Sequence, residues 1–285
     1  MSDPRDALDA IGQLPDVEID LAGAAIQLAR IDAPRLDWQA ANRHLSKLAR
    51  DAVSLANGLS GTDLTARAGA LAQLITGRHG YGGDTETYDD AANANLIQVI
   101  ERRRGLPVAL GILWLHCARA IGWGAHGVDF PGHFLVALEG QNLTRRGRAA
   151  EHRQLIVDVF AGGMPLAAPD MRSLLKRVDG PDAELRPGVL QPMSSRSVLI
   201  RLQNNIKSRR LANNDLPGAL SAIEDMLRIA PDTAVLWREA ALVNQHLEHV
   251  GAAVHCYERF LDLVPQGDAA LRTRAAIDEL RSRLN

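Results

Sequence analysis

Two residues in the middle of the chain, His133 and Asp158, have types and positions that suit a catalytic site. His133 opens the apolar stretch HFLVAL, and Asp158 stands near the end of a second one, QLIVDVF. Both stretches are expected to be strands, and if they are neighbours the imidazole and the carboxylate meet. A carboxylate that orients an imidazole is two-thirds of a nucleophile–base–orienter triad. The alternative is a histidine held in the core by hydrogen bonds, with no catalytic part.

Other candidate sites show weaker patterns. His116 and His126 flank the same region, but their spacing has no HxxxH character and does not predict a metal site. Residues 77–92 contain four glycines, yet they lack the P-loop lysine and run into an acidic stretch that would repel phosphate. The arginines at 102–104 can hold a carboxylate or a phosphate, or they are ordinary charges at a helix end. We expect no metal and no resident cofactor.

Composition excludes several classes of protein. The formal net charge is −2 and aromatic residues are 4% of the chain, with no basic–aromatic interleaving, so no nucleic-acid partner is expected. The longest apolar stretch, residues 107–125, is interrupted by His116 and Arg119, which predicts a core helix and no membrane partner. Only Cys117 and Cys256 are present, in different halves, which excludes a disulfide framework and suits a reducing cytoplasm. The acidic start of the chain does not resemble a signal peptide.

The elements around His133 and Asp158 predict an α+β domain. Apolar residues at helical spacing predict three helices in residues 1–80, among them 17–33 and 38–56, and a further helix over 96–103. Pro107 then suits the first turn of a helix over 108–121 that is apolar on nearly every face and therefore central. Strands are expected at 125–130, 133–138 and 154–160. The pattern is one of helices followed by an antiparallel sheet.

Residues 197–285 are wholly helical in pattern and contain an internal repeat. Three pairs of residues stand 34 apart: Ala219 and Ala253, Leu227 and Leu261, and Pro231 and Pro265. A helix–turn–helix unit of this period, with these small residues and prolines, is typical of tetratricopeptide (TPR) repeats. Two repeats and a cap helix are fewer than such arrays usually need, so this one should rely on the domain before it.

Residues 81–163 resemble the transglutaminase-like (papain-like) core. More closely, the ERRRGLP turn, the PGHF step and the end of the strand IVDVFAGG resemble the bacterial SirB family, in which such a core is followed by TPR repeats. The resemblance covers most of residues 15–280. It implies an N-terminal helical subdomain at 1–80, a transglutaminase-like core at 81–190 and a TPR array with a cap helix at 197–285.

The resemblance also assigns roles at the site. It matches His133 to the base and Asp158 to the orienting carboxylate, and it places the nucleophilic cysteine in the turn at residues 105–107. Pro107 stands there instead, and a proline has no group that attacks an acyl carbon. Cys117 lies about 15 Å further along the helix at 1.5 Å per residue, and we expect it to be a small buried apolar residue.

Two hypotheses about function follow. In the first, the chain is a non-catalytic scaffold or binding module for a protein or peptide, acting through the TPR groove, the residual pocket or both. Four residues of the first repeat helix could clamp an acidic or carboxylate group there, namely Asn204, Asn205, Lys207 and Arg210. The alternative for this basic segment is a solvated face. In the second hypothesis the chain is a hydrolase or acyl transferase that uses His133 and Asp158, with water or an unrecognised group as nucleophile.

Overall fold

The computed structural model describes residues 3–57, 59, 63–140, 153–185, 188 and 190–283. The chain forms two compact units, which we call the core unit (residues 20–198) and the helical-repeat unit (residues 1–19 and 199–285). The boundary between them falls within one helix, α8 (Ser195–Ala212). The segments expected at 1–80, 81–190 and 197–285 divide the chain differently, because residues 1–19 belong with the C-terminal helices.

The N-terminal helices of the core unit begin at aspartates. Asp20, Asp37 and Asp63 each accept a hydrogen bond from a backbone N–H of the first turn that follows, which satisfies a donor that the helix itself cannot. The helices are α2 (Leu21–Asp32), α3 (Trp38–Ala56) and α4 (Leu64–Ala72), and α4 continues into the π-helical turn η2 (Gln73–Arg78). The expected helix at 38–56 is confirmed, whereas the expected start at residue 17 lies in the 3-10 turn η1 (Asp16–Glu18).

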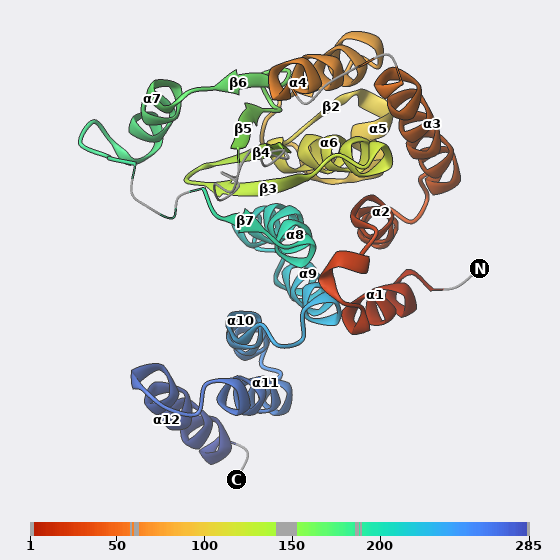
Figure 1. Ribbon diagram of the computed structural model, residues 1–285. Coiled ribbons are helices and arrows are strands. Elements are labelled where there is room, and N and C mark those ends of the chain that lie inside the picture. Colours follow the sequence, from red (N-terminus) through yellow and green to blue (C-terminus); the bar gives the residue numbers. More distant parts are fainter. Residues whose placement is uncertain are drawn as a thin grey trace. The chain divides into compact units, whose positions relative to one another are not determined.

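A buried helix, α6 (Pro107–Ile121), lies at the centre of the core unit, and it contacts α2, α3 and α4 as well as the sheet (Figure 1). It ends at Gly122, whose φ of 78° is the left-handed conformation that glycine adopts without strain. The chain reaches α6 through η3 (Ala91–Ala94) and α5 (Leu96–Arg102). Two short parallel strands, β1 (Gly82–Gly83) and β2 (Arg104–Gly105), pair just before it.

Over the residues that the structure describes, the sheet of the core unit has five strands, and all its neighbouring pairs are antiparallel, in the order β6-β5-β4-β3-β7. Three of these strands match the expected segments: β3 (Ala125–Phe130), β4 (His133–Gly140) and β5 (Arg153–Asp158). The edge strands β6 (Met164–Leu166) and β7 (Pro192–Met193) were not expected, because two or three residues are too few to show an alternating pattern.

Helices cover both faces of this sheet, which explains why β4 is buried without alternation from Phe134 to Leu138. On one face Leu135 and Ala137 pack with Met171 and Leu174 of α7 (Ala168–Asp179). On the other face the ring of Phe134 packs against α6 at Gly111. A Cβ atom at residue 111 would lie 2.2 Å from a ring carbon, so glycine permits this close approach.

The described residues of the helical-repeat unit contain helices and no strands. After α8 come α9 (Leu216–Ile229), α10 (Ala234–His246), α11 (Val250–Leu263) and α12 (Asp268–Ser282). The 34-residue period also appears in the turns, where Asn214 and Glu248 both take a left-handed φ, of 58° and 60°. Ala219 and Ala253 are each 0% exposed, because a small residue lets the helices of a pair approach closely.

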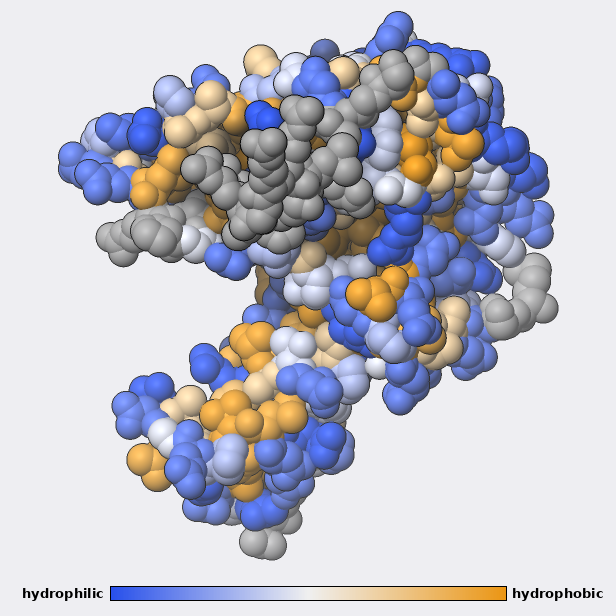
Figure 2. Space-filling model, viewed as in Figure 1, coloured by the Kyte–Doolittle hydropathy of each residue, from blue (hydrophilic) through white to orange (hydrophobic). Residues whose placement is uncertain are grey.

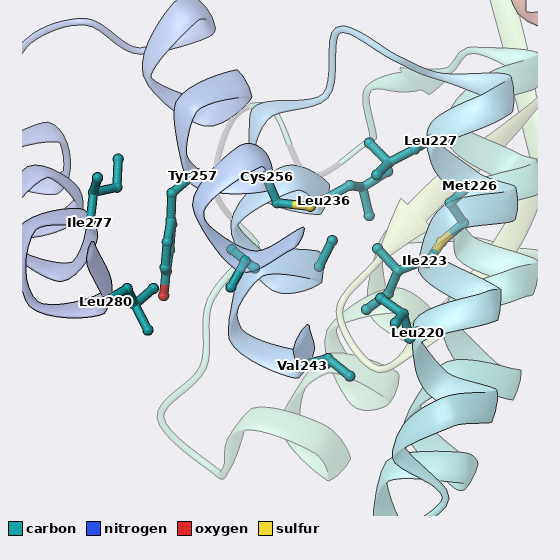
Figure 3. Packing of buried hydrophobic residues seen from close by; sticks show 13 residues of the cluster. Leu220, Ile223, Met226, Leu227, Leu236, Val243, Cys256, Tyr257, Ile277 and Leu280 are labelled. Atoms are coloured by element: carbon teal, nitrogen blue, oxygen red, sulfur yellow. The ribbon is translucent and has the colours of Figure 1, made fainter. Parts of the chain in front are cut away.

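One apolar core runs through α9, α10, α11 and α12. Figure 3 shows its members pointing toward one another from successive helices, with Leu236 between Leu227 and Cys256, and with Ile277 and Leu280 beside Tyr257. At the turn before α10, Trp237 donates a 2.7 Å hydrogen bond to the carbonyl of Pro231. The core is therefore continuous from one helix pair to the next, as the repeat pattern predicts.

The first helix of the chain, α1 (Pro4–Gln13), packs on α9 in this unit. Arg5 bonds both Asp225 and Ser221 at 3.0 Å, and Arg228 bonds both oxygens of Asp9, at 2.6 and 2.8 Å. Gly12 allows the contact, because a Cβ atom there would lie 2.2 Å from the carbonyl oxygen of Arg228. A segment from the start of the chain thus completes the helical unit. Among the described helices, none is long and apolar enough to cross a membrane.

Candidate functional site: a histidine–aspartate pair beside the central helix

The structure brings His133 and Asp158 together. His133 is the first residue of β4 and Asp158 the last of β5, and these two strands pair directly. The imidazole Nε2 lies 3.0 Å from Asp158 Oδ1, and the two side chains are 13% and 14% exposed. The carboxylate therefore holds the ring in one orientation, as the orienting member of a triad does.

Backbone groups complete the surroundings of Asp158. The N–H groups of Phe160 and Ala161 donate to its Oδ1 at 3.0 and 3.2 Å, and Gly163 N–H donates to its carbonyl at 2.7 Å. Burial by itself would raise the pKa of Asp158, but the hydrogen bonds from His133 and these N–H groups hold it below its ordinary value. The carboxylate is therefore ionised at neutral pH.

The ring of Phe160 connects this pair to the segment that precedes α6. It stands edge-on to the His133 ring, with the ring centroids 6.2 Å apart, and it covers Gly83 so closely that a Cβ atom there would lie 2.6 Å from three ring carbons. Gly83 in turn pairs with Gly105, two residues before Pro107. The pair and the start of the central helix thus belong to one neighbourhood of the core unit.

Pro107 occupies the first position of α6, and no side chain caps the helix at Leu106. Residues 105–109 are all buried. The first turn of α6 thus offers neither a nucleophilic side chain nor an exposed surface. Cys117 is 0% exposed, and burial raises the pKa of its thiol to about 12. Its thiolate, the form that reacts, is therefore nearly absent at neutral pH.

Each arginine at 102–104 has a partner within the core unit. Arg102 bonds the carboxylates of Asp84 and Asp90 at 3.1 and 3.2 Å, and Arg104 bonds the carbonyl of Gly80 at 3.0 Å. Hydrogen bonds from Thr87 lead the interactions that lower the pKa of Asp84 to about 2. These charges hold the loop over residues 84–90 against the end of α5.

Arg103 belongs to a polar cluster that the sequence did not indicate. Its guanidinium lies 4.8 Å from the ring centre of Tyr81, bonds the Tyr81 hydroxyl, and lies 2.8 Å from Nε2 of His44. His79 stands edge-on to His44 and lies 2.9 Å from a carboxylate oxygen of Asp51. Burial, followed by the charge of Arg103, lowers the pKa of His44 to about 4. The cluster combines residues of α3, of the segment that follows η2 and of the turn after α5, so no motif within one segment predicts it.

His116 and His126 lie apart from the pair. Nε2 of His116 lies 3.0 Å from the carbonyl of Leu45, and Nδ1 of His126 lies 2.7 Å from a carboxylate oxygen of Glu139. Within the described ranges, no group of three or more histidine, cysteine, aspartate and glutamate side chains is arranged to hold a metal ion. One ring nitrogen of each histidine therefore has a structural partner, while the buried Nε2 of His126 has none among the described residues.

The four residues expected to clamp a peptide lie on α8, and the structure gives three of them internal partners. Lys207 forms a 2.6 Å ion pair with Glu239 of α10 and is 8% exposed. Arg210 bonds the carbonyl of Gly218 at 2.7 Å, and Asn205 bonds the carbonyl of Arg201 at 2.8 Å. In Asn204, the buried Oδ1 has no hydrogen-bond partner among the described residues.

Comparison with known proteins agrees with this architecture. The family model of the transglutaminase-like superfamily matches residues 39–204, which is more than half of the chain. The chain belongs to the transglutaminase-like superfamily. A tetratricopeptide-repeat model matches residues 206–285, so the expected α+β core followed by helical repeats is confirmed.

Bacterial relatives match this superfamily member over most of their length. A UPF0162 protein of Xylella fastidiosa is 28% identical over 260 residues, which cover 90% of this chain and 88% of the relative. One of Pseudomonas aeruginosa is 29% identical over 280 residues, covering 98% and 96%. Among solved structures, the crystal structure of menin that reveals the binding site for the Mixed Lineage Leukemia protein aligns with a TM-score of 0.42 and 12% identity, over 98% of this chain and 70% of menin.

Proposed function

We propose that this chain is a non-catalytic, protein-binding member of the transglutaminase-like superfamily, of the SirB type. The observation that carries the proposal is Pro107 at the first position of α6, in a segment buried from residue 105 to 109. The position that the resemblance gives to a nucleophilic cysteine holds a side chain without a nucleophile. Losing the nucleophile of a triad costs about a million-fold in turnover.

Cys117 does not replace the missing group. It lies ten residues further along α6, which at 1.5 Å per residue is about 15 Å from the start of the helix. Its thiol is also buried and its pKa is raised to about 12. The hydrogen-bonded pair of His133 and Asp158 then stabilises the junction of β4 and β5 without carrying out acyl transfer.

Binding is assigned to the helical-repeat unit. TPR arrays present an extended surface formed by the first helix of each repeat, here α8 and α10. Val235 and Leu242 of α10 are 54% and 40% exposed, and Arg238 lies between them on the same stripe. Figure 2 shows apolar surface over α10, α11 and α12 bordered by hydrophilic side chains. An apolar stripe with one cation suits a peptide that carries apolar side chains and a carboxylate.

The internal contacts of α8 change how this proposal is tested. Charge reversal at Lys207 would break its ion pair with Glu239, so a loss of binding would not be specific. Arg238→Glu is the better variant because this side chain is exposed, and Arg272→Glu on α12 is the matched control. We expect an acidic peptide library to bind wild type and the control, and Arg238→Glu to weaken binding about tenfold, which is 1.4 kcal/mol. Equal binding by all three proteins would overturn the groove assignment.

A second candidate function, a hydrolase or acyl transferase that uses water as nucleophile, is favoured by the 3.0 Å contact between His133 and Asp158. Wild type and His133→Ala are compared on ester, amide and peptide substrates. We expect no difference between them, and activity that His133→Ala abolishes would overturn the non-catalytic proposal.

Pro107→Cys tests whether the site is a disabled acyl-transfer site. The new thiol would stand at a helix N-terminus in the neighbourhood of His133. We expect iodoacetamide to modify it slowly, because residues 105–109 are buried, but to begin to do so at lower pH than for an ordinary thiol. Adding His133→Ala should remove that shift. A thiol that reacts identically in both variants would show that His133 does not serve this position.

A further inference from the structure

The helical-repeat unit contains an open pocket of about 690 Å³ between α1, α9, α10 and α11. Sites for small molecules and peptide side chains have volumes of about 300–1,000 Å³ and combine apolar walls with a few polar groups. This pocket has both features: Leu227, Ala240 and Cys256 form apolar parts of the wall, and Asn244 and Glu224 contribute polar groups. Its volume and composition are those of a binding site.

The pocket is distinct from the peptide surface proposed above. It is lined by Trp237, Ala240 and Asn244 of α10, whereas the exposed stripe of that helix contains Val235, Arg238 and Leu242. Each pocket residue follows a stripe residue by two positions, which is about 200° around a helix. The two surfaces therefore face nearly opposite directions from α10.

The wall contributed by α1 is held in place. Asp9 and Gln13 of α1 line the pocket, and Asp9 is fixed by its two bonds to Arg228 on the opposite helix. Arg5 anchors the same helix through Asp225, whose side chain is 2% exposed. A pocket with walls already in place binds without the cost of ordering them.

The charges of the lining favour a cation. The ion pair neutralises Asp9 and Arg228, which leaves Glu224, an exposed side chain with no ion-pair partner among the described residues. The charged lining residues are two acids and one base, so the formal sum is −1 with histidine neutral. A ligand that combines an ammonium or guanidinium group with an apolar portion complements this set.

A buried amide adds a backbone-binding group. Asn244 is 4% exposed, and its Nδ2 donates to the carbonyl of Ala240 at 3.0 Å. Its other near neighbour is the sulfur of Cys256, at 4.0 Å, which is a weak acceptor. A peptide carbonyl that enters the pocket is a stronger acceptor for the second N–H. The amide therefore favours a peptide over a simple amine.

From this geometry we propose that the pocket between α1 and α9–α11 binds a peptide segment in which a lysine or arginine stands next to an apolar residue. The basic group pairs with Glu224, the apolar side chain lies against Leu227 and Ala240, and a backbone carbonyl accepts from Asn244. The proposal does not depend on the peptide surface of α8 and α10, because the pocket lies on the other side of α10.

Calorimetric titration of the full chain tests it, with capped tetrapeptides that alternate leucine with lysine or with glutamate. We expect the lysine peptide to bind in the pocket, and the glutamate peptide to bind only at the surface around Arg238, so that Arg238→Glu weakens binding of the glutamate peptide and leaves that of the lysine peptide unchanged. Glu224→Gln should weaken binding about three- to tenfold, as expected for loss of one partly exposed charge-assisted bond. Glu279→Gln, another exposed glutamate on α12, is the control and should bind as wild type does.

A second pair of variants separates the pocket from the remaining surface. Ala252 is an exposed lining residue, so Ala252→Trp fills the pocket without altering the core, and Ala275→Trp places the same bulk on α12. We expect Ala252→Trp to abolish binding and Ala275→Trp to preserve it. Lysine-peptide binding that survives Ala252→Trp, glutamate-peptide binding that Ala252→Trp abolishes, or no binding of the lysine peptide would each overturn the proposal. n-Butylammonium that binds as tightly as the peptide would overturn the peptide assignment.

The thiol of Cys256 gives an independent readout. It is 8% exposed and lines the pocket, while Cys117 is fully buried in the core unit, so mass spectrometry can assign each label. Bound lysine peptide should slow maleimide labelling of Cys256 at least about threefold. Unchanged labelling at saturating peptide would place the bound peptide outside the pocket and contradict the assignment.

Discussion

Replacing Arg5 by methionine tests how α1 is attached to the repeat array. Arg5 donates two hydrogen bonds of 3.0 Å, to Asp225 and Ser221, and the side chain of Asp225 is 2% exposed. Breaking a buried ion pair by removing one partner costs about 3–5 kcal/mol, because an uncompensated charge is left behind. The Arg5 side chain is 41% exposed, so water already reaches the arginine end of this pair. We therefore expect Arg5→Met to lower the free energy of unfolding by about 2–3 kcal/mol.

An exposed ion pair of the same unit supplies the control. Arg281 and Glu258 lie closer together, at 2.6 Å, but their side chains are 56% and 46% exposed. Arg281→Met should therefore cost less than about 1 kcal/mol, since exposed pairs contribute little. Burial, and not the N–O distance, decides the difference between the two variants.

The measurement is the free energy of unfolding from guanidinium titrations, with hydrogen exchange of the α9 amides as a local readout. Burial raises the pKa of Asp225 despite the bond from Arg5, and losing Arg5 raises it further. The folded variant then binds a proton more tightly than the unfolded chain, so the penalty is greatest near neutral pH and shrinks as pH falls. Adding Asp225→Asn to the Arg5→Met variant should restore at least about 1 kcal/mol of the lost free energy of unfolding. An Arg5→Met penalty no larger than that of Arg281→Met would refute the reasoning.

Three further predictions concern the core unit. Because the pKa of Asp158 is lowered in the folded protein, its ionised form contributes stability above the unfolded pKa of about 3.9, and this is lost as pH falls through the folded pKa. Asp158→Asn should therefore cost about 1–2 kcal/mol at pH 7 in denaturant titrations, and less below pH 4. Gly111→Ala should cost about 1–3 kcal/mol, because its Cβ would meet Phe134 at 2.2 Å, whereas Gly69→Ala, with nothing within 4 Å, should gain about 0.5–1 kcal/mol. With its thiol pKa raised to about 12, Cys117 should resist Ellman's reagent at pH 8 until the protein unfolds.

Each of these predictions has a clear opposite result. A pH-independent difference for Asp158→Asn would show that its carboxylate titrates alike in the folded and unfolded chain. Equal effects of alanine at residues 111 and 69 would contradict the close approach of α6 to β4. Rapid native labelling of Cys117 would contradict its burial.

Local sequence patterns were sufficient for the principal elements. The helix at 38–56 begins at an aspartate cap, and the 34-residue period indicated the helical repeat that contains α10 and α11. The alternation and composition of 125–138 placed β3 and β4. These predictions of helices and strands succeed because caps, apolar periodicity and repeat spacing are short-range properties that a single segment contains by itself.

The sequence also paired His133 with Asp158, because two adjacent antiparallel strands leave few other arrangements for residues at their ends. It did not anticipate the polar cluster around Arg103, the attachment of α1 to α9, or the ion pair that occupies Lys207. Each of these joins segments that are far apart in the chain. A side chain's type states which bonds it can make but not which distant partner will reach it.

The amino-acid sequence by itself thus determined the order of helices and strands, the repeat, and the absence of a cysteine at the start of the central helix. Tertiary structure decided what those residues do. Packing buried the segment around Pro107 and brought Lys207 of α8 into an ion pair with Glu239. It also made residues 4–13 one wall of a pocket with α9, α10 and α11. The physical reason is that burial and charge pairing are properties of neighbours in space, and the neighbours of these residues come from the opposite end of the chain or from another helix.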